Sequence, residues 1–185
     1  MSLELLARGP ARPDLREDLV VAEADLAEVL GRWSAPPPVA VPAGSGPAAG
    51  SGSGPAAGLP GLDAVAGVLA AGSPALVEVA PGLAGPGPAA DHLADLLAVA
   101  AHSGVGFGAG LVPRCAVADQ VWALLSGAVA AMTGADVRAA LAHPDPAALV
   151  ALSRSAREAV RDVVTCVVVP AADVARVTAE LTAAG

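Results

Sequence analysis

The chain has 185 residues, 55% of them hydrophobic, and its 18 acidic and 10 basic residues give a net charge of −8. This length suits one ordinary domain with additional segments, and the hydrophobic content excludes a chain that is disordered throughout. Because a nucleic-acid backbone needs a positively charged protein face, the acidic balance argues against a nucleic-acid partner.

The first predicted element is a helix over residues 13–33. Pro13 stands near its start, and Gly31 suits its end. The apolar residues within it recur at intervals of four and three, which places them along one narrow line suited to packing on another helix. We call this line the seam, and its large members are Leu15, Leu19, Leu26, Val29 and Trp33.

The predicted helix is followed by a stretch of low complexity. Residues 34–60 contain only Ser, Ala, Pro, Val, Gly and Leu, and the heptapeptide at 44–50 recurs unchanged at 52–58. Small residues of this kind do not build a core, so we expect a flexible, disordered linker. The sequence thus predicts three parts: an N-terminal amphipathic helix at 1–33, the linker at 34–60 and a folded domain at 61–185.

Three short apolar runs in the remaining sequence predict β-strands, at residues 76–80, 105–112 and 163–169. Each run stops at a proline, and an alanine-rich stretch with helical spacing follows. The order strand, proline, helix, repeated along a chain, is typical of an α/β domain. The run at 163–169 is the richest in β-branched residues, which predicts a buried central strand.

Further helices are predicted at residues 63–71, 89–101, 115–132, 136–141, 145–161 and 172–183. Asp145 and Pro146 form a favourable N-cap and first-turn pair at the start of one of them. We therefore predict a small three-layer α/β domain with about three mainly parallel strands and flanking helices. A ferredoxin-like α+β arrangement is the alternative.

The glycine-rich run at 104–109 has the spacing G-x-G-x-x-A of a dinucleotide-binding fingerprint. That fingerprint needs a strand before the glycines and a helix after them, so that helix amides meet the pyrophosphate. Here a predicted helix comes before the run, and a strand-like sequence follows. We interpret the run as a strand whose glycines let a helix pack closely, and we predict no cofactor.

Chemically useful side chains follow the predicted strands at what we call the strand-end rim, the edge of the sheet where the strands end. Ligands of open α/β sheets bind beyond this edge. Cys115 would start a helix beside Arg114, and a helix start and a neighbouring arginine both lower thiol pKa values. His92, near the start of the helix after another strand, is a candidate base for that thiol. The candidate residues of the rim are Arg114, Cys115, His92, Asp119 and Asp173.

Two other groups are interpreted without a functional role. Asp91, His92 and Asp95 share one predicted helix, but His92 points away from the two carboxylates, so we predict no metal site. Cys166 lies inside an apolar strand and is predicted to be a core residue.

The lack of a complete catalytic group favours a non-catalytic role, although it leaves open whether the chain is an enzyme. We predict a protein–protein interaction or assembly module, an accessory or regulatory subunit that binds another protein or a second copy through the seam. The alternative is a small enzyme or ligand-binding domain that uses the strand-end rim. The first residues lack the features of a signal peptide, and the longest uncharged apolar stretch is interrupted by turn residues, so we expect a cytoplasmic protein with no membrane contact.

Overall fold

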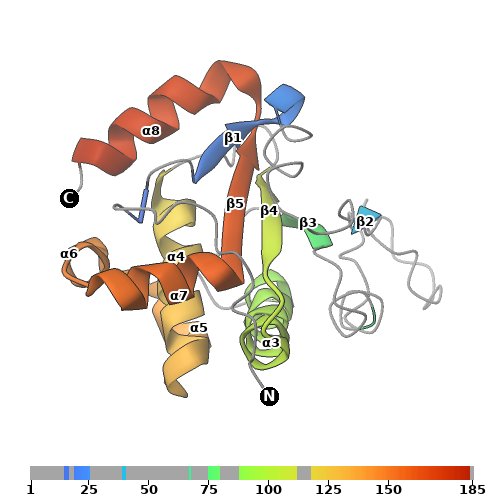
Figure 1. The fold of residues 1–185 in the computed structure, drawn as a ribbon, viewed down its shortest axis with the longest axis vertical. Helices are drawn as coiled ribbons and strands as arrows, with labels where there is room; N and C mark the ends of the chain where they lie inside the picture. The colour runs from blue at the N-terminus through green and yellow to red at the C-terminus, as the bar shows by residue number, and fades with distance from the viewer. Residues whose placement is uncertain are drawn as a thin grey trace, which may run out of the picture.

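A parallel β-sheet forms the frame of the molecule (Figure 1). The computed structural model describes residues 15–16, 19–25, 39–40, 67, 75–79, 88–111 and 118–183. Within these residues the sheet has five strands in the order β1-β5-β4-β3-β2, and every neighbouring pair is parallel. The strands are β1 (Val20–Ala22), β2 (Val39–Ala40), β3 (Ala75–Val79), β4 (Phe107–Leu111) and β5 (Val164–Val169).

The parallel sheet and its flanking helices confirm the predicted α/β class. β3, β4 and β5 occupy the three apolar runs that were predicted to be strands. β5 lies between β1 and β4, and all six of its residues are buried, as expected for a strand rich in β-branched residues. A ferredoxin-like sheet contains antiparallel neighbours, and the described strands form none, so that alternative is wrong.

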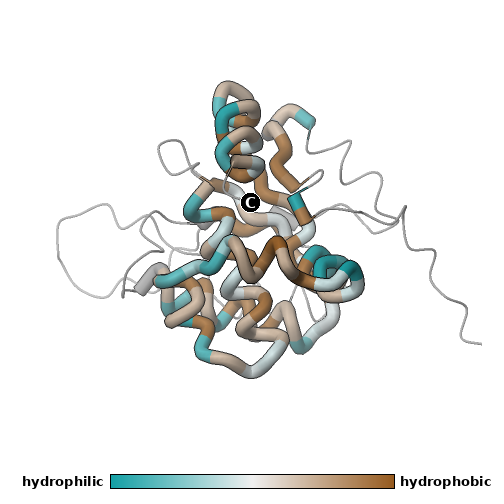
Figure 2. Tube along the Cα trace, turned by 90° about the vertical axis from the view of Figure 1, so that its left-hand side faces the viewer, coloured by the Kyte–Doolittle hydropathy of each residue, from teal (hydrophilic) through white to brown (hydrophobic). Residues whose placement is uncertain are grey.

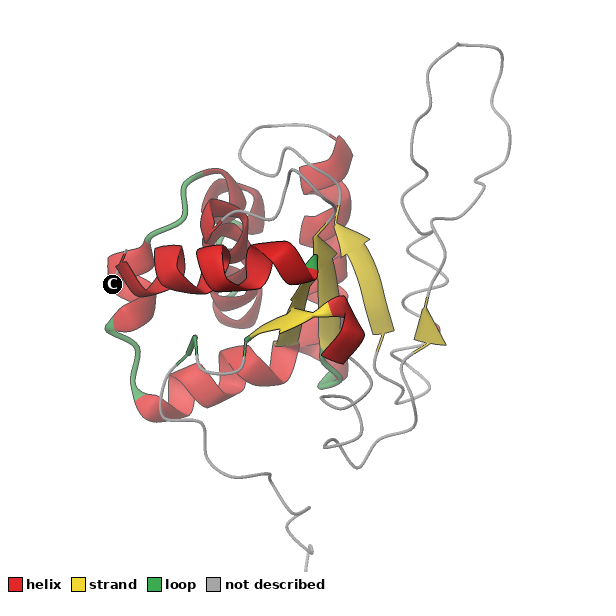
Figure 3. Ribbon diagram, turned by 90° about the horizontal axis from the view of Figure 1, so that it is seen from above, coloured by secondary structure: helices red, strands yellow, loops and turns green. Residues whose placement is uncertain are grey.

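Most of the described helices lie on one side of the strands when the sheet is seen from above (Figure 3). The helices, with two short 3₁₀ segments, are η1 (Glu23–Asp25), α3 (Pro88–Ser103), α4 (Ala118–Thr133), α5 (Val137–Ala142), α6 (Pro146–Val150), α7 (Arg154–Val163), η2 (Ala171–Asp173) and α8 (Val174–Ala183). The single helix predicted over 145–161 is wrong, because α6 and α7 are separate helices. Ser153 starts the second of them: its Oγ accepts a hydrogen bond from the Ala156 N–H at 3.2 Å.

The N-terminal residues belong to the sheet. The helix predicted over 13–33 is wrong at Val20–Ala22, which form β1, and at Glu23–Asp25, which form η1. Parallel pairing with β5 explains the difference, since the Val167 N–H donates to the Leu19 carbonyl at 2.7 Å. The two valines of β1 also suit a strand. Tertiary pairing thus overrides the helical spacing of the leucines.

The seam is divided between the core and residues outside the described ranges. Leu15 and Leu19 are buried in the main hydrophobic cluster of the domain. The remaining seam members lie outside the described residues: Leu26, Val29 and Trp33. Of the predicted linker at 34–60, only Val39–Ala40 are described, as the strand β2 paired with β3. The predicted boundaries between the three parts of the chain stay predictions.

The main core lies between one face of the sheet and the helices α3, α4, α7 and α8. Ala109 and Val167 stand in register on this face. Because neighbouring residues of a strand point to opposite faces, the other face carries a second, smaller cluster. Val21, Cys166 and Val168 form it, so Cys166 is a core residue as predicted. Figure 2 shows the hydrophobic segments of the trace running through the centre of the molecule.

Two glycines allow close packing between elements. A Cβ added at Gly127 of α4 would lie 2.7 Å from Leu97 Cδ1 of α3 and 2.8 Å from Leu141 Cδ2 of α5. A Cβ added at Gly106 would collide with the backbone carbonyl of Asp162 in α7. The close approach of α7 to Gly106 confirms, for this one glycine of the run at 104–109, the prediction that its glycines let a helix pack closely.

Candidate functional site

The strand-end rim brings together the start of α4 and the segment of η2 and α8. β3, β4 and β5 are parallel neighbours, so they all end at the same edge of the sheet. α3 follows β3, α4 follows β4, and η2 with α8 follows β5. α4 and η2 begin near the edge beyond which ligands of open α/β sheets bind. α3 lies at the opposite end of the strands in Figure 1, and its first turns contact Arg138 of α5.

Three of the five predicted rim residues lie within the described ranges. Asp119 is exposed in the first turn of α4, His92 is half-buried near the start of α3, and Asp173 ends η2. Arg114 and Cys115 lie outside the described residues. The predicted pairing of the Cys115 thiol with the His92 imidazole therefore stays a prediction.

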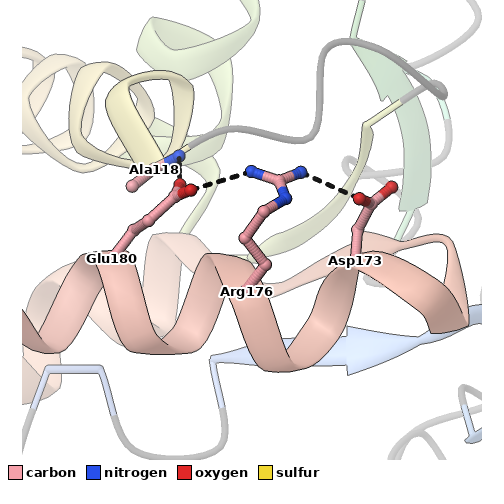
Figure 4. A network of polar contacts seen from close by, with 4 residues as sticks. All are labelled: Ala118, Asp173, Arg176 and Glu180. Carbon is pink, nitrogen blue, oxygen red and sulfur yellow. Dashed lines mark hydrogen bonds and ion pairs between the residues drawn. The ribbon is translucent and has the colours of Figure 1, made fainter.

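An ion-pair network joins η2 and α8 to the start of α4 (Figure 4). Arg176 Nη2 donates to Asp173 Oδ1 at 2.8 Å, and Arg176 Nη1 donates to Glu180 Oε1 at 3.0 Å. The second oxygen of Glu180 accepts a hydrogen bond from the backbone N–H of Ala118 at 3.4 Å. The hydrogen bond to Asp173, followed by that to Glu180, raises the pKa of Arg176 above its ordinary range. The guanidinium therefore stays charged at any physiological pH.

The network holds Asp173 and adds two rim residues that the sequence analysis missed. Asp173, Arg176 and Glu180 are spaced three and four residues apart, which is the spacing of ion pairs along one helix face. That spacing is visible in the sequence. The contact from Glu180 to the start of α4 is not visible there, because it depends on how two distant helices pack.

Three buried polar atoms near the starts of α3 and α4 have no hydrogen-bond partner in the described part of the chain: His92 Nε2, Gln120 Oε1 and Trp122 Nε1. Trp122 is 2% exposed, and its indole N–H can only donate. Gln120 Oε1 can only accept, whereas His92 Nε2 takes either role according to its tautomer. Leaving such an atom unpaired costs about 1–3 kcal/mol, so a bound ligand that supplied the partners would be stabilised.

The sequence analysis identified His92 but missed Gln120 and Trp122. The helix predicted at 115–132 is strongly apolar, so its tryptophan reads as an ordinary core side chain. The sequence does indicate that Gln120 and Trp122 lie in the first two turns of a helix that follows a strand. Their place in the sequence does not reveal that the indole N–H is buried without a described partner.

The two carboxylates on either side of His92 in the sequence are bound by an arginine. Arg138 of α5 donates through Nε to Asp91, and its Nη2 lies 3.7 Å from Asp95 Oδ1. The hydrogen bond to Asp91 is the largest of the effects that raise the pKa of Arg138. Across the residues that the structure describes, no group of three or more His, Cys, Asp or Glu side chains could hold a metal ion.

None of the described helices combines the length and apolar character needed to cross a membrane. Comparison with protein-family models, with curated proteins and with solved structures gave no match. The residues of the strand-end rim are therefore interpreted from their own chemistry and placement.

Proposed function

We propose that this domain binds a small polar ligand at the strand-end rim, at the start of α4. The observation that carries the proposal is a pair of buried polar atoms without a described hydrogen-bond partner in the first two turns of this helix: Gln120 Oε1 and Trp122 Nε1. Protein interiors satisfy the large majority of such atoms, so two of them near one helix start point to a missing partner.

The two atoms define the chemistry of the ligand. Trp122 Nε1 needs an acceptor, and Gln120 Oε1 needs a donor. A small molecule with a donor and an acceptor on nearby atoms meets these requirements, whereas an apolar molecule would leave both atoms unpaired.

The proposal concerns binding and assigns no reaction. The thiol and the arginine that were predicted to act at this edge, Cys115 and Arg114, lie outside the described residues. Asp173 is engaged by Arg176. His92 Nε2 is also buried without a described partner, but the first turns of α3 contact α5 and do not reach the start of α4.

The function predicted from the seam, an accessory or regulatory subunit that binds another protein or a second copy, stays a prediction. So does the cytoplasmic location. Leu15 and Leu19 are buried in the domain's own core, and the other seam residues lie outside the described ranges. The strand-end rim therefore has the stronger support.

A thermal-shift screen of the full-length protein tests this function, with amino acids, hydroxy acids, amides and small sugars as probes. Compounds that raise the melting temperature are then titrated calorimetrically into Trp122→Phe and Gln120→Leu. His102→Phe is the control, because His102 is exposed in the last turn of α3 and its Nδ1 contacts the Ala98 carbonyl.

Each rim variant should bind about tenfold more weakly than the wild type, since one hydrogen bond to a buried group is lost. The control should bind like the wild type. A screen in which no compound raises the melting temperature, or equal binding by all three variants, would contradict the proposal.

A further inference from the structure

The second face of the sheet, which we define as the face that carries Val21, Cys166 and Val168, is buried without help from the described helices. Its cluster contains strand residues alone, whereas residues of α3, α4, α7 and α8 belong to the main cluster on the other face. Cys166 is nevertheless 0% exposed and Val168 is 7% exposed. Parallel sheets occur almost only with both faces covered. The second face therefore needs a cover that the described helices do not supply.

The strand order indicates which connection crosses this face. From β3 to β4 to β5 the chain moves one strand at a time toward β1, and the helices between these strands pack on the main core. From β1 to β2 the chain moves in the opposite direction, from one edge of the sheet to the other. Connections between parallel strands are right-handed in about 98% of cases, so a connection that moves the opposite way lies on the opposite face. This rule assigns the connection between β1 and β2 to the second face.

The connection between β1 and β2 is long enough to cross the sheet. η1 ends at Asp25 and β2 begins at Val39, so residues 26–38 make the connection. Three strands separate β1 from β2, which gives a width of about 19 Å at the usual strand spacing of about 4.8 Å. An extended chain covers about 3.3 Å per residue, so residues 26–38 reach about 40 Å. Two helical turns within them would still leave enough length to cross.

The side chains of this connection suit the second face. The seam members that the main core does not use all lie within it: Leu26, Val29 and Trp33. On the second face, β4 presents glycine beside both buried residues of β5. Gly108 stands in register with Cys166, and Gly110 stands in register with Val168. Glycine on a sheet face permits a close approach, and the indole of Trp33 is large enough to fill the space that two missing side chains leave.

We propose that the second face is the docking surface for residues 26–38 of the same chain, with the remaining seam members packed against the cluster of Val21, Cys166 and Val168. The seam is then used within one molecule. Leu15 and Leu19 pack in the main core, and the later seam members pack on the opposite side of the same sheet. This occupant leaves no seam residue for a second protein, so the proposal opposes the interaction module predicted from the sequence.

Alkylation of the Cys166 thiol by iodoacetamide in the full-length protein tests the proposal, because Cys166 lies on the second face. Every sample carries Cys115→Ser, which leaves Cys166 as the single thiol, and the protein with this change alone is the parent. Trp33→Ala removes the largest side chain of the proposed cover. Arg32→Ala is the matched control, since Arg32 is adjacent to Trp33 and lies off the seam. Leu181→Ala in the main core shows how far a general loss of stability accelerates alkylation.

Trp33→Ala should be alkylated at least about tenfold faster than the parent, because removal of a packed side chain favours local opening. It should also react faster than Leu181→Ala in urea concentrations that make the two variants equally stable. Val29→Ala, the milder change, should show a smaller acceleration, and Arg32→Ala should react at the rate of the parent.

Three results would overturn the proposal. Equal rates in the parent and both seam variants would mean that another part of the chain covers the face. A parent rate that rises on dilution would mean that a second copy covers it. Rapid alkylation of the parent at every concentration would mean that the face is open in the isolated protein, as expected for a surface that serves another protein.

Discussion

The guanidinium of Arg16 donates a hydrogen bond to the main-chain carbonyl of Leu181 at 3.2 Å, which joins the N-terminal segment to the last turn of α8. The last carbonyls of a helix have no partner within it and favour a cation. Leu19 lies three residues from this contact and accepts a hydrogen bond from β5. The N-terminal segment is thus bound to the folded domain at two places, to α8 through Arg16 and to β5 through Leu19.

Replacement of Arg16 by alanine should therefore lower the free energy of unfolding by about 1 kcal/mol, the net value of one protein hydrogen bond. Urea denaturation of the full-length protein measures the change. Arg154→Ala is a control, because that arginine is exposed on α7 and pairs only with its neighbour Glu158 among the described residues. Equal stability of the wild type and Arg16→Ala would contradict the role given to this contact.

Leu19→Ala should destabilise the domain by about 2–5 kcal/mol, the usual cost of truncating a large buried side chain. Leu19 is fully buried in the main core. Denaturation with urea and sedimentation analysis should be run on the same samples. If Leu19→Ala leaves the stability intact but abolishes an association, the residue serves a partner and the placement in the core is wrong.

Gly127→Ala should lower stability by about 1–3 kcal/mol, because the new methyl group would press on Leu97 and Leu141 in a packed interior. Gly67 provides the comparison. Among the described residues, a Cβ added there meets nothing within 4 Å, so Gly67→Ala should be neutral or slightly stabilising. The melting temperatures of the two variants measure the difference. A lower melting temperature for Gly67→Ala than for Gly127→Ala would show that α4 does not approach α3 and α5 as described.

Val167→Asp and Val168→Asp should each prevent soluble expression. The two side chains lie in different hydrophobic clusters on opposite faces of β5, and both are buried. An unpaired carboxylate on either face would carry a large desolvation cost. Expression trials measure the soluble yield of each variant. Thr178→Asp is the control, because Thr178 is exposed on α8. Survival of either β5 variant would place β5 at an edge.

Cys166 should be inert to a thiol reagent in the native protein, since its side chain is fully buried in the sheet. The variant Cys115→Ser leaves Cys166 as the single thiol, so labelling can be followed without ambiguity. Rapid labelling before unfolding would show that the face with Val21 and Val168 is open to solvent.

Much of the fold was predictable because its signals are local. The β-branched run that became β5 and the apolar runs that became β3 and β4 carry their strand preference in their own residues. β1 was missed because its strand conformation depends on pairing with β5, which is far away in the sequence. The break at Ser153 was missed because apolar spacing continues across it, while a single hydroxyl cap starts the new helix.

The candidate site was predictable only in outline. Strand-then-helix order predicted a rim that includes His92, but the first turns of α3 contact α5 and lie away from the start of α4. The importance of Gln120 and Trp122 comes from buried atoms without partners, which is a property of packing. The role of Glu180 likewise arises from the meeting of α8 with α4.

The indole N–H resonance of Trp122 in the full-length protein tests the central claim most directly, because it reports on the hydrogen bond that the ligand should supply. Trp122→Phe assigns the resonance, since the chain has two tryptophans. We predict that a compound found in the thermal-shift screen moves this resonance downfield, in proportion to its occupancy. A compound that binds and stabilises the protein while the Trp122 resonance stays in place would contradict a ligand site at the strand-end rim.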